Sequence, residues 1–344
     1  MEKIKVLVVD DSLFIRRVLT DILNADPHIE VVEQAVDGLD ALQILSKTKV
    51  DVVTLDLDMP KLDGLATLKK IMEMKHPPAV VVVSSYTQNG AAITIECLQS
   101  GAVDFVLKLV GSETGELQAL APEIIKKVKI ASAVNREKLK PLYTQKTVDF
   151  VPKKENKMGA VVIGSSTGGT VALEHLLPGL PNNFPYPVLI AQHLPAKFVE
   201  SLVVILRESC LLPIKMGEEK EIVQPGVVYF APGGCDMQVI RDERDKICLT
   251  LIEDDAILTP SVDKLMTSAT KVYGENTIGI ILTGMGNDGL DGMRTIKEAH
   301  GKTLVQDEKT SVVFGMGREV IEAGLADHVL PLDKIAQKVV EKYL

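Results

Sequence analysis

The first feature of the chain that could carry out chemistry is a serine in a glycine-rich turn. The sequence GSSTGG (residues 164–169) follows an apolar run and precedes a helical pattern, and Ser166 is the central residue of its G-x-S-x-G match. A strand, a tight turn and a helix in this order expose the central side chain at the top of a sheet and turn backbone N–H groups toward it. Alone the motif is weak evidence for a nucleophile, because glycine-serine turns also bind phosphate or only connect elements. This turn itself contains neither the dinucleotide motif G-x-G-x-x-G nor a P-loop lysine.

A nucleophilic serine needs a base, and the base needs a carboxylate that orients it. His193 follows a second apolar run and is the best placed of the six histidines. Asp288 lies in the glycine-rich sequence TGMGNDG (residues 283–289) after a third apolar run, and it is the candidate orienting carboxylate. The backbone N–H groups of Thr167 and Met285 are candidate donors to a developing oxyanion.

A second group of polar residues stands at the ends of apolar runs in the first part of the chain. Asp10 and Asp11 end the first run, Asp56 the third, Ser84 the fourth and Lys108 the fifth. Three carboxylates would repel one another unless a hard divalent cation lay among them, and Mg²⁺ binds through few carboxylates plus water and phosphate oxygens. The pattern predicts a phosphoryl-acceptor site with Asp56 as the nucleophile, in which Lys108 and Ser84 hold the phosphoryl oxygens.

An α/β architecture in each part of the chain would bring the residues of each group together. In the first part of the chain, strands are expected at residues 5–9, 31–36, 50–55, 79–84 and 105–107. In the second part, strands are expected at residues 160–164, 188–192, 227–231, 247–252, 277–283 and 302–306. Alternation of strands with helical patterns predicts parallel sheets covered by helices, whose functional side chains gather at the carboxyl ends of the strands.

A segment with Lys, Pro and Thr separates the two parts. A helix is expected at residues 117–134, and apolar periodicity is weak from there to Lys157. We expect a first domain at residues 1–131, a linker at 132–157 and a second domain at 158–344. The predicted fold class is α/β throughout, with a doubly wound, flavodoxin-like first domain and a mostly parallel second domain.

The composition excludes several classes of function. With 344 residues and 46% hydrophobic content the chain can bury two cores, and its net charge of -9 gives no basic excess to attract nucleic acid or an anionic membrane surface. The four cysteines lack C-x-x-C spacing, so neither a zinc site nor a disulfide framework is indicated. The first apolar run ends at two aspartates rather than at a signal-peptide cleavage site, and no stretch approaches the roughly 18 apolar residues of a membrane helix. We expect a soluble cytoplasmic protein without membrane insertion.

The first part of the chain resembles response-regulator receiver domains over about residues 3–130. The motifs that carry the resemblance are VVDDS (8–12), LDLDMPKLDG (55–64), VSS (83–85) and AVDFVLK (102–108). The resemblance implies that a histidine kinase phosphorylates Asp56 with Mg²⁺ present, and that Ser84 and Phe105 move on activation. Receivers commonly have proline directly after the lysine, whereas Lys108 is followed here by Leu109.

Over essentially the whole chain the resemblance is to the CheB family of chemotaxis methylesterases. Its three signatures occur in order as GSSTGG (164–169), AQHLP (191–195) and LTGMGNDG (282–289). The resemblance implies that Ser166 is the nucleophile, His193 the general base and acid, and Asp288 the orienting carboxylate, without a cofactor for ester hydrolysis. It also implies hydrolysis of glutamate γ-methyl esters on methyl-accepting chemoreceptors, deamidation of receptor glutamines, and a CheA-type kinase as phosphodonor.

Two alternatives compete with a methylesterase. A DNA-output or binding module would need a helix-turn-helix signature or a basic stripe, which the second part lacks. A general esterase or amidase acting on another substrate would use the same three residues, and methanol release from methylated receptors would distinguish it. Asp263 and Lys264 are interpreted as a solvated helix face rather than as catalytic residues.

Overall fold

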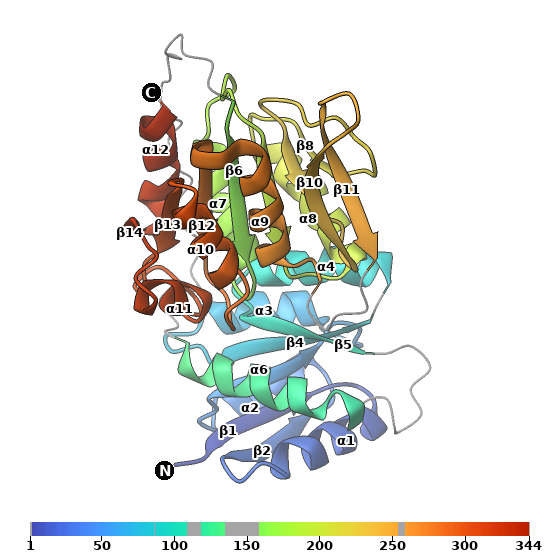
Figure 1. Ribbon diagram of the computed structural model, residues 1–344. Coiled ribbons are helices and arrows are strands. Elements are labelled where there is room, and N and C mark those ends of the chain that lie inside the picture. The colour runs from blue at the N-terminus through green and yellow to red at the C-terminus, as the bar shows by residue number, and fades with distance from the viewer. Residues whose placement is uncertain (1, 86, 109–117, 135–157, 254–258, 344) are drawn as a thin grey trace. The chain divides into compact units, whose positions relative to one another are not determined.

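Two compact units make up the chain. The computed structural model describes residues 2–85, 87–108, 118–134, 158–253 and 259–343. The units comprise residues 1–141 and 142–344 and are described one at a time. Figure 1 shows that each is built from strands and helices in alternation. Within the described ranges, no helix combines the length and the apolar character that a bilayer crossing requires.

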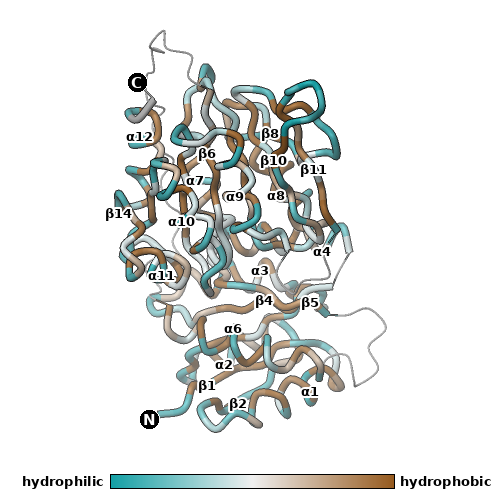
Figure 2. Tube along the Cα trace, in the orientation of Figure 1, coloured by the Kyte–Doolittle hydropathy of each residue, from teal (hydrophilic) through white to brown (hydrophobic). Residues whose placement is uncertain are grey.

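The first unit is built on a parallel sheet of five strands. Its strand order is β2-β1-β3-β4-β5, and every neighbouring pair is parallel. The strands are β1 (Ile4–Val9), β2 (Ile29–Ala35), β3 (Val52–Asp56), β4 (Ala79–Ser85) and β5 (Asp104–Lys108). This is the flavodoxin-like order, so the predicted doubly wound fold is confirmed. The inner strands are apolar along most of their length, as β4 shows in Figure 2, because helices cover both faces of the sheet.

Among the described residues, five helices of the first unit cover its sheet, and the first four of them connect its strands. They are α1 (Leu13–Asn24), α2 (Gly38–Leu45), α3 (Gly64–Met72), α4 (Gln88–Gln99) and α6 (Ala121–Ala133). Helices α1 and α6 pack together, while α3 contacts both α2 and α4. Short polar side chains start the first four helices by accepting a backbone N–H of the first turn. These capping residues are Ser12, Asp37, Asp63 and Thr87.

The second unit contains a parallel sheet of seven strands and a separate hairpin. The sheet order is β14-β13-β12-β6-β7-β9-β8. Its strands are β6 (Ala160–Ser165), β7 (Val188–Gln192), β8 (Ile214–Met216), β9 (Val228–Phe230), β12 (Thr277–Ile281), β13 (Lys302–Gln306) and β14 (His328–Leu330). The hairpin pairs β10 (Cys235–Arg241) with β11 (Ile247–Glu253) in antiparallel register. The predicted mostly parallel α/β fold is therefore confirmed.

Strand order in this sheet creates the place for a site. The chain runs from β6 outward through β7 to β8 and β9, and then returns to the other side of β6 with β12. In open α/β sheets, ligands bind at the carboxyl ends of strands where the order reverses in this way. The helices are α7 (Gly169–Leu176), α8 (Ala196–Ser209), α9 (Val262–Tyr273), α10 (Leu290–Glu298), α11 (Met316–Glu322) and α12 (Leu332–Tyr343). Among these helices, α9 and α10 make the most extensive contact.

Several elements differ from the expectations. Strands β8, β10 and β14 were not expected, because two of them have three residues each and β10 mixes polar with apolar residues. The last helix of the first unit begins at Ala121, since Pro122 occupies its first turn, where a missing N–H is tolerated. Residues 135–157, where most of the linker was expected, and Leu109 lie outside the described residues.

Candidate functional site

Three strand ends meet at the serine turn of the second unit. The N–H of His193 donates to the carbonyl of Ser165 at 3.0 Å, which joins the ends of β7 and β6. The N–H of Ser166 donates to the carbonyl of Thr283 at 3.1 Å, which joins β6 to the loop after β12. The expected serine, histidine and aspartate loops therefore converge at one edge of the sheet.

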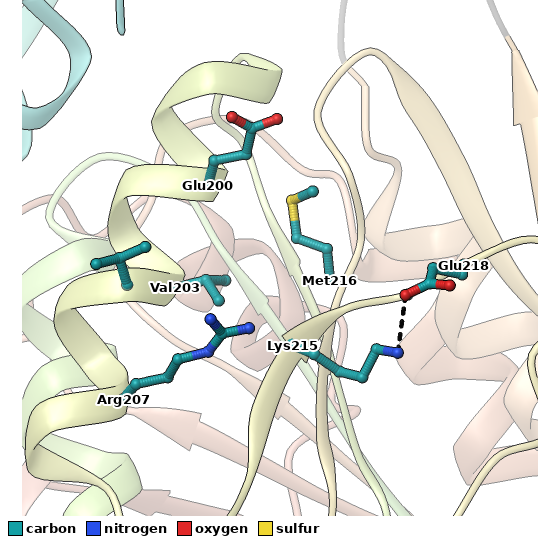
Figure 3. A pocket seen from close by; sticks show the side chains of 8 residues that line it. Glu200, Val203, Arg207, Lys215, Met216 and Glu218 are labelled. Atoms are coloured by element: carbon teal, nitrogen blue, oxygen red, sulfur yellow. Dashed lines mark hydrogen bonds and ion pairs between the residues drawn. The ribbon is translucent and has the colours of Figure 1, made fainter. Parts of the chain in front are cut away.

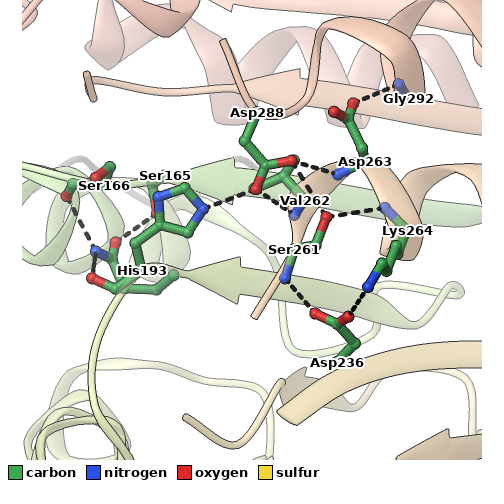
Figure 4. Close-up of polar contacts among 11 residues, drawn as sticks. Ser165, Ser166, His193, Asp236, Ser261, Val262, Asp263, Lys264, Asp288 and Gly292 are labelled. Atoms are coloured by element: carbon green, nitrogen blue, oxygen red, sulfur yellow. Dashed lines mark hydrogen bonds and ion pairs between the residues drawn. The ribbon is translucent and has the colours of Figure 1, made fainter. Parts of the chain in front are cut away.

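His193 and Asp288 are joined directly. Their Nε2 and Oδ2 atoms lie 2.8 Å apart, and both side chains are largely buried. Because Nε2 contacts the carboxylate, Nδ1 is the ring nitrogen that can accept the Ser166 hydroxyl proton. Figure 4 shows this edge of the ring facing the end of β6. No hydrogen bond joins Ser166 Oγ to the imidazole within the described residues. Catalytic contacts of this kind often close only when substrate binds.

The N-terminus of α9 holds the Asp288 carboxylate in place. Oδ2 accepts the N–H of Val262 at 2.8 Å, and Oδ1 accepts the N–H of Asp263 at 2.9 Å. The Ser261 hydroxyl adds a longer contact of 3.3 Å to Oδ1. Because a helix N-terminus carries a partial positive charge and unpaired N–H groups, it favours the ionised form of a carboxylate.

These contacts set the ionisation state of Asp288. Burial alone would raise the pKa of this carboxyl, but the hydrogen bonds from His193 and from the Val262 and Asp263 N–H groups outweigh burial and hold the pKa below its usual value. Asp288 is therefore a carboxylate at neutral pH. An ionised, fixed acid beside an imidazole orients the ring and stabilises the imidazolium that forms when the ring takes a proton.

Asp263 is not part of a solvated helix face, contrary to expectation, whereas Lys264 beside it is exposed as expected. Asp263 is half-buried and its Oδ1 accepts the N–H of Gly292 at 2.6 Å. Burial raises the pKa of Asp263 to about 6, opposed by the Gly292 bond and reinforced by the neighbouring Asp288 charge. Lys264 pairs with the buried Asp236 at 2.6 Å. For Asp263 the prediction was wrong, because the start of α9 lies against α10 and the β10 hairpin, which sequence periodicity does not reveal.

Gln192 is a further site residue that sequence reasoning missed. Its side chain is buried, with 2% of its surface exposed. Its Nε2 donates to the Ser166 carbonyl at 3.0 Å, and its Oε1 accepts the Ser165 hydroxyl at 2.5 Å. Gln192 thus ties the serine turn to the strand that carries His193. The available signal was a polar residue at the end of an otherwise apolar strand.

The glycine loop before Asp288 approaches the serine turn closely. A methyl group added at Gly284 would lie 2.8 Å from Ser166 Cβ, so only glycine allows this approach. The hydroxyl of Thr283 donates to the carbonyl of Thr167 at 2.9 Å and so steadies the residue after the serine. Met285 follows Gly284 directly, which puts its backbone beside the serine turn. The two expected oxyanion donors, at Thr167 and Met285, thus come from neighbouring segments.

A second site lies at the carboxyl ends of the strands in the first unit. Oxygen atoms of Asp10, Asp11 and Asp56 lie within 4.8 Å of one another. Lys108 Nζ contacts Asp10 Oδ2 at 2.7 Å and Asp56 Oδ1 at 2.8 Å. Burial raises the pKa of Asp56 to about 6, with Lys108 opposing the shift and Asp10 adding to it. A three-carboxylate set of hard oxygen donors fits a divalent metal ion, whose charge would offset their repulsion.

Ser84 lies near the end of β4, and Phe105 lies on the neighbouring strand β5. Ser84 is fully buried, and its hydroxyl accepts from Thr94 Oγ1 at 2.7 Å on α4. The Phe105 ring is also buried, with Lys127 Nζ 5.0 Å from its centroid. The structure therefore brings together the three aspartates and Lys108, whereas Ser84 is turned toward α4.

A pocket elsewhere on the second unit has no part in either site. It has a volume of about 480 Å³ and lies between α8 and β8 (Figure 3). Arg207 Nε donates to the Ile214 carbonyl at 2.8 Å, and Lys215 pairs with Glu218 at 2.9 Å. Its lining residues are Glu200, Val203, Val204, Arg207, Lys215, Met216, Gly217 and Glu218. None of them is a predicted catalytic residue.

Comparison with known proteins gives the same division of the chain. Residues 161–339 match the model of the CheB methylesterase family, and residues 6–120 match the response regulator receiver domain. A protein-glutamate methylesterase/protein-glutamine glutaminase of Thermotoga maritima is 43% identical, covering 98% of each chain. One of the same description from Pyrococcus abyssi is 40% identical, covering 98% of this chain and 93% of that protein.

A solved structure agrees with the fold of the second unit. The crystal structure of the Thermotoga maritima CheB methylesterase catalytic domain is 42% identical, with a TM-score of 0.52. It covers 54% of this chain and 98% of that one. From the family match and from relatives that span nearly its whole length, the chain belongs to the CheB methylesterase family and carries a receiver domain at its N-terminal end.

Proposed function

We propose that Ser166, His193 and Asp288 form the catalytic triad of a protein-glutamate methylesterase and protein-glutamine glutaminase whose substrates are chemoreceptors. The contact between His193 Nε2 and Asp288 Oδ2, at 2.8 Å and beside the serine turn, carries this proposal. An imidazole fixed by a buried carboxylate next to a serine is the arrangement that acyl transfer requires. Such adjustment of receptor methylation serves chemotactic adaptation.

The reaction follows from the roles of the three side chains. Ser166 Oγ attacks the γ-carbonyl carbon of the methylated glutamate while His193 accepts the hydroxyl proton. His193 then gives that proton to the leaving methoxide, so methanol departs and an acyl-serine remains. Water attacks the acyl-serine with His193 again as the base, which releases the glutamate γ-carboxyl and restores Ser166. With glutamine in place of the ester, ammonia leaves in the first half of the reaction.

The developing oxyanion needs donors in fixed positions. The N–H groups of Thr167 and Met285 are proposed for this role, since Gly284 lets the two segments approach and Thr283 fixes the Thr167 peptide. Donors fixed before the reaction stabilise transition-state charge without the cost of reorganisation. Removal of one such donor typically costs about 100- to 1000-fold in kcat.

The receiver unit regulates this activity through Asp56. We propose that Asp10, Asp11 and Asp56 hold Mg²⁺, which when bound supplies positive charge that offsets the carboxylates and an incoming phosphoryl group. An Asp56 carboxylate oxygen attacks the phosphorus of a phosphohistidine supplied by a CheA-type kinase, the P–N bond breaks and the histidine leaves, and Lys108 pairs with the transferred phosphoryl group. Ser84, near the end of β4, and Phe105, on β5, are the proposed switch residues.

A methanol-release assay tests the activity and its substrate. A methylated receptor fragment is incubated with the full chain, with and without acetyl phosphate and Mg²⁺, and methanol is measured. Release that rises with the phosphodonor supports the proposal. Hydrolysis of nitrophenyl acetate without methanol from the receptor would instead indicate a general esterase.

A further inference from the structure

Asp236 stands out as a buried acid behind the triad. It lies on β10, has no exposed surface, and belongs to neither the serine turn nor the loop that carries Asp288. A buried carboxylate is costly unless each of its oxygens has a partner. Here Oδ1 accepts the N–H of Ser261 at 2.7 Å, and Oδ2 accepts from Lys264 Nζ at 2.6 Å.

Both partners of Asp236 belong to the start of α9. Ser261 is the N-cap residue of this helix, and its hydroxyl accepts the N–H of Lys264 at 3.3 Å. The next two N–H groups, those of Val262 and Asp263, bind the Asp288 carboxylate. Figure 4 shows Asp236 and Asp288 on opposite sides of this first turn, one below Ser261 and the other above Val262.

We propose that Asp236 is a positioning residue for the triad, acting through the backbone of Ser261. Asp236 anchors the first turn of α9 to the β10 hairpin. The Val262 N–H in that turn then fixes Asp288 Oδ2, the oxygen that contacts His193. The role requires an acceptor at the position of Oδ1, whereas the ion pair with Lys264 contributes to stability. This inference rests on the assignment of Ser166, His193 and Asp288 as the catalytic residues.

Three substitutions separate the acceptor from the ion pair. Asp236→Asn keeps an oxygen acceptor for the Ser261 N–H but removes the charge. Lys264→Met keeps the carboxylate and its bond to Ser261 but removes the cation. Asp236→Ala removes both contacts. Each variant is made in the full chain, and kcat, KM and the melting temperature are measured with a methylated receptor fragment.

Positioning predicts a pattern that loss of stability alone does not. Asp236→Ala is expected to lower kcat by about tenfold or more with little change in KM, as for other residues that hold an active-site side chain in position. Asp236→Asn and Lys264→Met are expected to keep kcat within about threefold, although both lose the ion pair and melt at a lower temperature. If activity falls in step with melting temperature across all three variants, Asp236 has only a structural role.

Two further results would overturn the proposal. One is full activity of Asp236→Ala, and the other is an Asp236→Asn variant as impaired as Asp236→Ala. If Asp236→Ala does not fold, Asp236→Glu replaces it, because it keeps the charge but moves the acceptor by one methylene, and the same fall in kcat is expected. Ser166→Ala is assayed in parallel: activity in that variant refutes the triad itself, whereas an inactive Ser166→Ala beside a fully active Asp236→Ala refutes only the role of Asp236.

Discussion

Asp288 and Asp263 accept N–H groups from the starts of two neighbouring helices: Asp288 from α9, and Asp263 from α10. Asp288, just before α10, accepts the first two N–H groups of α9, and Asp263, in the first turn of α9, accepts the N–H of Gly292 in the first turn of α10. Four N–H groups at each helix start lack partners within the helix, so this exchange stabilises both ends. The orienting acid is therefore part of the packing of α9 on α10, and its position depends on that packing.

Replacement of Asp288 by asparagine should nearly abolish catalysis. The amide cannot be an anion, and it places either an oxygen or an NH₂ group against His193, which favours the wrong tautomer of the ring. We expect kcat for methanol release to fall by about 1000- to 10,000-fold, as in other triads. A rate within a few fold of the unsubstituted protein would remove Asp288 from the triad.

Ser166→Ala should abolish ester hydrolysis and leave the receiver intact. The nucleophilic oxygen is lost, but the turn keeps its backbone bonds from Ser166 N to Thr283 O and from Gly169 N to Ser166 O. The expected variant melts at the same temperature and is phosphorylated at the normal rate, yet releases no methanol above background. Its matched control is Ser165→Ala, which removes the neighbouring hydroxyl that bonds Gln192 rather than the proposed nucleophile. Turnover by Ser166→Ala would refute the nucleophile assignment.

The charge of Asp263 should make stability fall as the pH rises. Its pKa is raised from 3.8 to about 6 in the folded protein, so between those values the folded state keeps a proton that the unfolded state has lost. The free energy of unfolding then decreases with rising pH across this window, by an amount on the order of 1–3 kcal/mol. Asp263→Asn retains an acceptor for Gly292 but does not titrate. Its melting temperature relative to the unsubstituted protein should rise from pH 4 to pH 7, and a difference independent of pH would contradict this.

The triad residues could be predicted from the sequence, whereas the residues that hold them in place could not. Ser166, His193 and Asp288 each follow an apolar run in sequence, and the parallel sheet brings such ends to one edge, so their convergence was predictable. The contacts that hold them were not. Gln192 acts across strands, and Asp236 comes from a hairpin whose register depends on tertiary packing. Asp263 was misread because a charged residue in a first helical turn appears the same in sequence whether water or another helix lies beside it.

Phosphorylation of the receiver should require both Asp56 and a divalent cation. The three carboxylates lie within 4.8 Å and would repel an anionic donor unless a cation offset their charge. With acetyl phosphate, we expect labelling in the presence of Mg²⁺, none with EDTA, and none in Asp56→Ala. The label should survive a gel run at neutral pH and should be removed by strong acid or by hydroxylamine, as an acyl phosphate is. Acid-stable label, or label that survives in Asp56→Ala, would point to another acceptor.

The unphosphorylated receiver is expected to inhibit the methylesterase unit. Phosphorylation at Asp56 can raise activity only to the extent that the phosphorylated receiver binds the catalytic unit less well than the unphosphorylated one, because a ligand shifts an equilibrium by its difference in affinity for the two states. A shortened protein that begins near residue 158 keeps β6 and every proposed catalytic residue, and its fold corresponds to the catalytic domain solved by itself from Thermotoga maritima. It should release methanol faster than the unphosphorylated full chain and should not respond to acetyl phosphate. If the shortened protein is folded but no faster than the resting full chain, inhibition by the receiver is wrong, and phosphorylation must instead activate by creating a productive surface.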